Sequence, residues 1–164
     1  MFRYNIALGR GAVWGIGLGK TSYSKYPNYN AGTSIVMNVG TTNSIELAEF
    51  GIEAELTHTI TPIKVDPAIA FHEVKVMTFG LYGIYRYRFT DRFYARAKLG
   101  LVNYDYRWDY GTKHTHDRDD NSLSIAFGAG VGAYLTDTTR LYGDYIFVDG
   151  SDLKQFNVGV QQSF

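Results

Sequence analysis

The sequence predicts an all-β fold, an eight-stranded antiparallel up-and-down transmembrane β-barrel that forms a single domain over residues 1–164. Three observations predict it: the alternation of apolar and polar residues, an asymmetry in the lengths of the connections, and the composition. Aromatic residues make up 16% of the chain, and 18 glycines accompany only 3 prolines. This composition favours strands and tight turns over helices.

The alternation places strands along the whole chain. We predict strands at residues 3–22, 32–41, 45–60, 72–90, 93–108, 122–136, 140–149 and 154–164. The connections on one side are short turns, at 41–44, 90–92 and 136–139. Three of the four connections on the other side are longer and more polar, at 24–30, 61–70 and 109–121. Bacterial outer-membrane barrels show this asymmetry, with short periplasmic turns and longer extracellular loops.

The first strand departs from the pattern at Arg10. Arg10 is in phase with the apolar residues Leu8 and Ala12, and an arginine that faces lipid at mid-depth would cost about 2–4 kcal/mol. A glycine stands on either side of it, and glycine in a strand often marks a bulge that resets the phase. Either a bulge lies here, or residues 1–10 lie below the membrane.

The following strands each have an apolar face and a face of glycine, tyrosine and charged residues. In the fifth strand Phe93, Ala95, Ala97, Leu99 and Leu101 alternate with Tyr94, Arg96, Lys98, Gly100 and Val102. The third, fourth and sixth strands alternate in the same way. The charged residues of the second face in the third to fifth strands are Glu49, Glu53, Glu55, Arg86, Arg88, Arg96 and Lys98.

Glycine indicates which face lines the interior. On a solvent face glycine weakens a strand and packs against nothing, whereas inside a narrow eight-stranded barrel it makes room for bulky neighbours. The opposite charges would form a satisfied polar cluster inside, while on a surface their pairs would contribute little. We therefore predict that the apolar face contacts lipid and that a polar plug fills the lumen. The alternative is a soluble, lipocalin-like barrel with the faces reversed.

Composition and the N-terminal segment exclude several classes of protein. The formal net charge is +0, so a nucleic-acid partner is not expected. There is no cysteine for disulfides or thiolate chemistry. No apolar run of about 18 residues is present to form a transmembrane helix. The start "MFRYNIALGR" lacks the features of a signal peptide; if the protein is exported, we expect this sequence to be its mature form with an added Met.

The end of the chain resembles a known family. In "KQFNVGVQQSF" the apolar residues Phe156, Val158 and Val160 are in phase before the final Phe164. This pattern is similar to the C-terminal strand signal that the assembly machinery of bacterial outer-membrane proteins recognises. The stretches "FYARAKLGLVNYDY", "SLSIAFGAGVGAYL" and "RLYGDYIF" resemble strands of the small barrels of the OmpA, OmpX and opacity-protein superfamily. The resemblance implies a place in the bacterial outer membrane, with membrane lipid and the assembly machinery as partners.

The polar loop "HTHDRDD" is the best candidate for site chemistry. Its weak metal-ligand candidates are His114, His116 and Asp120. The spacing matches no fixed site, so we interpret the loop as a solvated extracellular segment and predict no metal and no cofactor.

Histidine and tyrosine near the predicted loops offer two further hypotheses. His58 and His72 lie near the outer strand ends. A histidine beside a serine or glutamate there would suit a lipid-acting hydrolase such as a lipid A deacylase, but the His–Ser pairing characteristic of that family is not evident. Tyr23, Tyr26 and Tyr29 would form either an adhesive surface or part of an aromatic girdle.

The sequence thus favours a monomeric, non-enzymatic barrel in a structural or surface-interaction role. Envelope integrity, adhesion and host interaction all suit such a barrel, acting through its extracellular loops, with host or matrix surface molecules as further partners. The alternatives are a lipid-modifying enzyme of the outer membrane, and a narrow channel or small-ligand binder, because small barrels host unlike functions.

Overall fold

The computed structural model describes residues 11–23, 31–64, 73–109 and 120–164, and every regular element within them is a β-strand. The strands are β1 (Gly11–Tyr23), β2 (Gly32–Ile45), β3 (Ala48–Thr61), β4 (Ile63–Lys64), β5 (Glu73–Arg88), β6 (Phe93–Asp109), β7 (Asp120–Tyr134), β8 (Thr139–Val148) and β9 (Leu153–Ser163). No helix among the described residues is long and apolar enough to cross a membrane.

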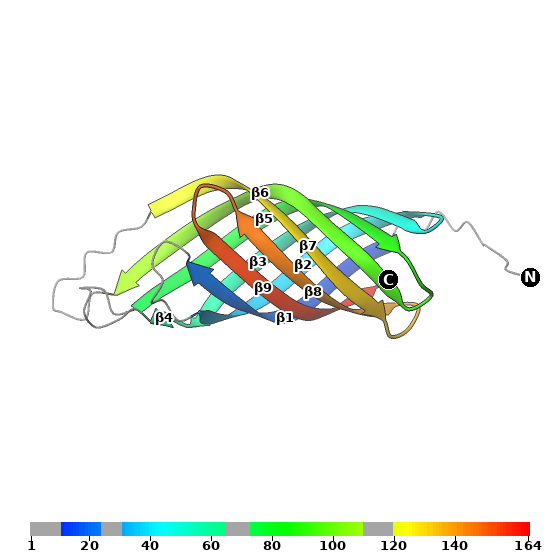
Figure 1. The fold of residues 1–164 in the computed structure, drawn as a ribbon, viewed down its shortest axis with the longest axis horizontal. Coiled ribbons are helices and arrows are strands. Elements are labelled where there is room, and N and C mark those ends of the chain that lie inside the picture. Colours follow the sequence, from blue (N-terminus) through cyan, green and yellow to red (C-terminus); the bar gives the residue numbers. More distant parts are fainter. Residues whose placement is uncertain (1–10, 24–30, 65–72, 110–119) are drawn as a thin grey trace, which may run out of the picture.

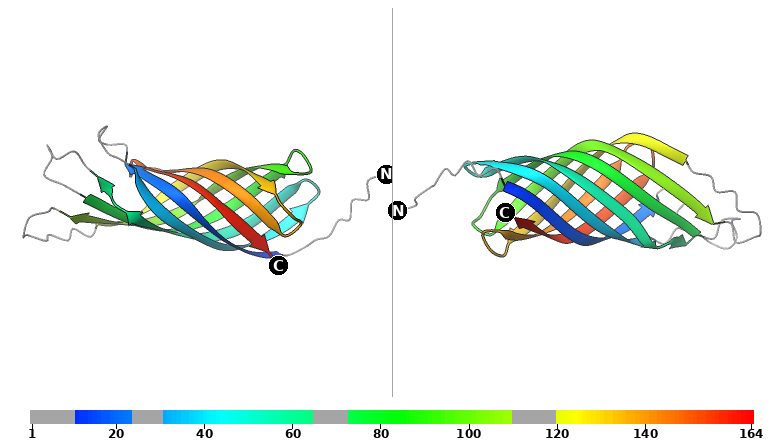
Figure 2. Two further views of the ribbon diagram at one scale, coloured as in Figure 1. Left: turned by 90° about the horizontal axis from the view of Figure 1, so that it is seen from below. Right: turned by 180° about the vertical axis from the view of Figure 1, so that it is seen from behind.

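Eight long strands close into a barrel, and all of their pairings are antiparallel (Figure 1). Neighbours in sequence are neighbours in the sheet, and β1 pairs with β9 while β3 pairs with β5. The predicted up-and-down barrel is therefore confirmed. Short turns and the C-terminus lie at one end, here called the turn end; the opposite end is the loop end (Figures 1 and 2).

Two predicted boundaries near the turn end and the loop end are wrong. The segment 41–44 is not a turn, because Thr42 pairs with Gly51 as β2 continues to Ile45. The reversal occurs at Glu46, which has a positive φ of 53°; the threonine, asparagine and serine of 41–44 were compatible with a turn but equally with an exposed strand end. The predicted loop 61–70 contains the short strand β4.

The first predicted strand lies only partly within the described residues. The structure describes it from Gly11 and not from residue 3. Arg10 lies outside the described residues, so both hypotheses for its phase remain predictions.

The wall between β3 and β5 contains an interruption. Main-chain pairing of these strands ends at His58 and Met77, and β4 resumes it where Ile63 pairs with Val74. Within this interval the hydroxyl of Thr59 donates to the carbonyl oxygen of Val76 at 2.8 Å and accepts from its amide at 3.3 Å. A side chain therefore replaces main-chain hydrogen bonds at one point of the wall.

The two faces of the strands point as the glycine argument predicts. Along β5 the side chains of Phe79 and Leu81 are more than half exposed, whereas Tyr82 and Arg86 are almost fully buried. The outer surface carries large apolar side chains on every long strand, for example Leu99 at 64% exposure. Such a surface requires lipid contact, so the soluble barrel with reversed faces is ruled out.

The lumen has two layers. Toward the loop end it is filled by apolar and tyrosine side chains, including Val76, Val102, Ile146 and Leu153. Toward the turn end it is filled by charged and amide side chains. The polar layer is the candidate functional site.

Glycines on the inner face make room for the tyrosines. A Cβ atom added at Gly159 would lie 2.6 Å from the Tyr142 hydroxyl, and one at Gly17 would lie 3.1 Å from it. A tyrosine ring thus covers the backbone of two neighbouring strands, in the way that aromatic residues cover strand glycines in curved sheets.

Candidate functional site in the barrel lumen

Three glutamates of β3 supply the anionic side of the site. Glu49, Glu53 and Glu55 alternate with outward-facing residues, so all three point into the lumen. In the adjacent β5, Arg86 is paired in register with Glu49. Arg96, on β6, is in turn the register partner of Arg86. The strand period alone therefore brings these charges together from three neighbouring strands.

Glu53 is the centre of the cluster. Its carboxylate accepts from Nη2 of Arg96 at 2.5 and 2.7 Å, and Nζ of Lys98 lies 2.8 Å away. Nε2 of Gln161 donates to Glu53 at 2.7 Å. All four side chains are nearly inaccessible to solvent.

Lys98 connects Glu53 to two further carboxylates. Its Nζ lies 2.6 Å from Oε2 of Glu55 and 3.1 Å from Oδ2 of Asp144. Nη1 of Arg96 is 3.3 Å from the same oxygen of Asp144. Asp144, on β8, therefore joins β3 and β6 in one network.

A second group of contacts surrounds Glu49 toward the turn end. Its Oε2 lies 3.2 Å from Nη1 of Arg86 and 2.9 Å from Nη1 of Arg140. The Tyr134 hydroxyl donates to the other carboxylate oxygen at 2.7 Å. Arg86 links this group to the centre, because its Nη2 donates to Oε1 of Gln161 at 3.0 Å.

The network crosses the barrel. β3 and β8 are four strands apart in either direction around the closed sheet, so they form opposite walls. The ion pair between Glu49 and Arg140 therefore spans the lumen, as do the contacts that link Glu53 to Asp144 through Arg96 and Lys98.

The charges of the lumen cancel in the part of the chain that the structure describes. The buried or partly buried acids are Glu49, Glu53, Glu55 and Asp144, and the buried bases are Arg86, Arg96, Lys98 and Arg140. Four negative charges thus face four positive ones. Taking charges out of water is costly unless each is paired, and every member of this set has an opposite charge within 4 Å.

One predicted member of the cluster does not belong to it. Arg88 is exposed, and its guanidinium lies 4.5 Å from the centre of the Tyr134 ring. Arg88 is the last residue of β5, where the strand leaves the barrel at the turn end, so its inward phase no longer directs the side chain into the lumen.

Sequence analysis missed part of the site. Arg140, Asp144 and Gln161 were not predicted, although the inward positions of "TRLYGDYIFV" carry Arg140, Tyr142 and Asp144 in strict alternation. Applying the same two-residue period to β8 would have found both charges. The same period also places Gln161 on the inner face of β9, next to the outward-facing Val160, but an uncharged amide gives no reason to assign it to a charged cluster.

The remaining candidates do not form a second site among the described residues. The side chain of His58 is exposed on the outer face, between inward-facing Thr57 and Thr59, and His72 lies outside the described residues. No group of three or more His, Asp or Glu in the described ranges is arranged to hold a metal ion. His114 and His116 lie outside those ranges, as does the side chain of Asp120 at the start of β7.

The predicted tyrosine surface and the predicted C-terminal assembly signal have different outcomes. The side chains of Tyr23, Tyr26 and Tyr29 lie outside the described residues. On β9 the side chains of Phe156, Val158 and Val160 are exposed in phase on the outer face, and Phe164 is 77% exposed. Recognition of these residues by an assembly machinery stays a prediction.

A closed antiparallel barrel with an apolar outer surface and a charged interior defines an integral membrane β-barrel. The chain matches the family model described as "Outer membrane protein beta-barrel domain" over residues 7–164. It therefore belongs to that family, and it is a bacterial outer-membrane protein.

Solved structures share this fold at low sequence identity. OprG of Pseudomonas aeruginosa has a TM-score of 0.67 at 11% identity, with 94% of this chain and 96% of that chain covered. Ail of Yersinia pestis, in complex with the heparin analogue sucrose octasulfate, has a TM-score of 0.63 at 10% identity, with 94% and 99% covered. Neisserial surface protein A has a TM-score of 0.56 at 15% identity, with 94% and 97% covered. No curated protein sequence matches the chain.

Proposed function

We propose that this protein is a non-enzymatic surface-interaction barrel that acts through its extracellular side. The observation that carries the proposal is the ion-pair network that joins opposite walls of the lumen. A lumen that holds eight paired charges and, above them, an apolar layer leaves the loop end as the part available to partners. The turn end then faces the periplasm, as the short turns of this class of barrel do.

Structural neighbours support an attachment role. Ail is described as the attachment invasion locus protein and was solved with a heparin analogue, and the neisserial neighbour is described as a surface protein. We infer that the extracellular loops of this chain contact a host or matrix surface molecule while the barrel stays monomeric in the membrane. A heparin-like polyanion is the first ligand to test.

The experiment compares the full barrel with a loop variant. Purified barrel in nanodiscs is passed over immobilised heparin and matrix proteins, and a second preparation has residues 110–119 replaced by a Gly-Ser linker. Saturable binding that the replacement weakens supports the proposal. Equal binding by both preparations, or none by either, contradicts an attachment role for this loop.

Two parallel measurements test the alternatives. The same nanodiscs are incubated with lipopolysaccharide, and released fatty acid is measured; release would identify a lipid-modifying enzyme. The barrel is also inserted in planar bilayers, where steady conductance would identify a channel and would contradict a closed lumen.

A further inference from the structure

Two lysines on the outer surface differ from the cations of the lumen. Lys20 on β1 and Lys154 on β9 point outward near the loop end. Among the described residues neither lysine forms an ion pair, whereas every buried cation in the lumen has one. Within the described part of the chain, their charges are therefore not neutralised by a carboxylate.

The register places the two lysines next to each other. Lys20 is paired with Phe156, and Lys154 is paired with Ser22 across the same β1–β9 ladder. The lysines are thus diagonal neighbours on one face, about 7–8 Å apart between Cα atoms. Nζ of Lys154 also lies 5.9 Å from the centre of the Phe147 ring on β8.

The position of the two lysines along the membrane normal matches that of the lipid headgroups. Lys154 lies ten residues before Phe164, the residue that follows β9, in the same outward phase. A strand tilted by about 40° rises about 25 Å over that length, which equals the usual height of the lipid-facing apolar band. Phe156, Val158, Val160 and the half-buried Gln162 occupy the row between them. The ammonium groups therefore lie at the upper boundary of the band.

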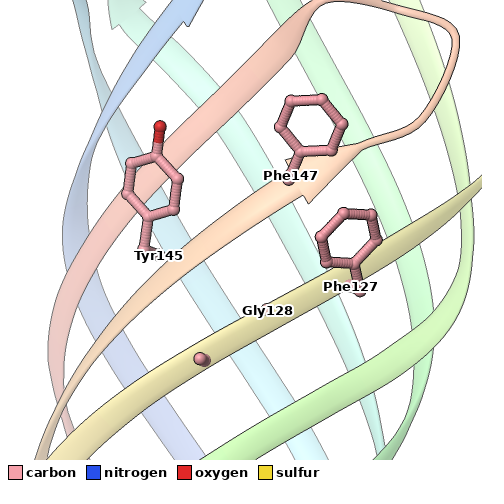
Figure 3. A pocket seen from close by; sticks show the side chains of 5 residues that line it. Phe127, Gly128, Tyr145 and Phe147 are labelled. Carbon is pink, nitrogen blue, oxygen red and sulfur yellow. The ribbon is translucent and has the colours of Figure 1, made fainter.

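Two shallow apolar hollows lie in the outer surface beside the lysines. One, of about 490 Å³, is below the pair and is lined by Leu18, Ile35, Leu141 and Val158 among others. The other, of about 340 Å³, lies between β7 and β8 and includes Phe147, the ring that Lys154 contacts. Figure 3 shows the rings of Phe127, Tyr145 and Phe147 around this second hollow, above Gly128.

We propose that Lys20 and Lys154 bind a phosphate of an outer-leaflet lipid whose acyl chains lie in these two hollows. Lysine binds phosphate as a point charge, and an unneutralised pair of like charges gains most from an anion placed between them. The hollows supply apolar contact at the depth of the acyl chains. The site thus recognises one anionic lipid molecule rather than the bilayer as a whole.

The test uses bisphosphorylated lipid A as the probe, titrated into the full-length barrel in zwitterionic detergent and followed by native mass spectrometry. The double variant Lys20→Gln/Lys154→Gln should raise the Kd about 30-fold, since each lysine near an anionic surface contributes about fivefold. The matched control Lys64→Gln/Lys75→Gln removes the same charge from the opposite wall, where β4 and β5 lie, and should leave the Kd within about threefold. Faster migration of unheated samples on SDS gels verifies that each variant is folded.

Further measurements distinguish a lipid phosphate from free phosphate and test whether the hollow below the lysines contributes to binding. Dephosphorylated lipid A should bind the wild type as weakly as the double variant binds the intact lipid. Val158→Trp, which fills the hollow below the lysines, should weaken binding, and Leu81→Trp on the outer face of β5, on the opposite wall, should not. Equal Kd values for the double variant and the wild type would overturn the proposal. Full competition by millimolar inorganic phosphate would also overturn it, because the site would then be a simple anion site.

Discussion

Glu49 and Arg140 form a 2.9 Å ion pair between opposite walls of the barrel, from β3 to β8. This pair joins a network in which each charge depends on others from distant parts of the sequence. Removing one member leaves its partners buried with one opposite charge fewer, which is more destabilising than losing an exposed pair. Substitutions in the lumen therefore test the structure directly.

Glu53→Ala should be among the most destabilising single substitutions in the lumen. It removes one of the two carboxylates that Arg96 and Lys98 share and leaves only Asp144 in contact with both, at a cost of about 3–5 kcal/mol in a dry interior. Urea unfolding in lipid vesicles measures the change in midpoint. Glu46→Ala, in the exposed β2–β3 turn, is the control and should leave the midpoint unchanged. An unchanged midpoint for Glu53→Ala would show that the cluster does not stabilise the barrel.

Arg86→Ala and Arg88→Ala should differ strongly although the residues are two positions apart. Arg86 is buried against Glu49 and Gln161, so its loss should cost about 3–5 kcal/mol. The Arg88 guanidinium lies against the Tyr134 ring from an exposed position, a contribution of about 0.5–1 kcal/mol. The same unfolding assay compares them. Equal effects would place Arg88 in the lumen, as the sequence pattern alone predicts.

Gly159→Ala should destabilise the barrel by about 1–3 kcal/mol, because the new methyl group would lie 2.6 Å from both the Tyr142 hydroxyl and the carbonyl oxygen of Ile16. Gly143→Ala is the matched control, since its Cβ would meet nothing closer than 3.9 Å. The free energy of unfolding is measured for both. Tyr142→Ala combined with Gly159→Ala should cost less than the sum of the single changes. Additive effects would contradict direct contact between the two positions.

Thr59→Val should loosen the wall between β3 and β5. The substitution keeps the shape but removes both hydrogen bonds to the backbone of Val76, so its amide should exchange with solvent faster. Hydrogen exchange followed by NMR in micelles measures this at one residue. Thr57→Val is the control, because the Thr57 hydroxyl is buried without a hydrogen bond in the described structure, and its loss should not destabilise the protein.

The two-residue alternation of side chains along a strand made most of the fold predictable. It failed at the position of one turn and at the direction of one side chain, which the alternation does not determine. It gave the number of long strands and the lipid-facing side, because one face must be apolar along each span. It did not locate the turn at Glu46, since polar residues in 41–44 are compatible with a turn and with an exposed strand end. It misplaced Arg88, because phase no longer fixes direction where a strand leaves the barrel.

The composition of the site was less predictable than its position. The charges of β3, β5 and β6 were visible in the sequence, but their partners Arg140 and Asp144 come from β8 on the opposite wall. Contacts across a lumen depend on strand tilt and side-chain length. Neither quantity is encoded in the alternation of a single strand.

The balance of four acids against four bases in the lumen also affects how the barrel responds to voltage. A charge that moves across a membrane is driven by about 2.3 kcal/mol per 100 mV. A neutral set carries no such coupling as a whole, so an electric field does no net work on the interior when the barrel enters the bilayer. The lumen set is therefore expected to add no dependence on membrane potential to insertion, whereas a substitution that removes one of its charges would add such a dependence.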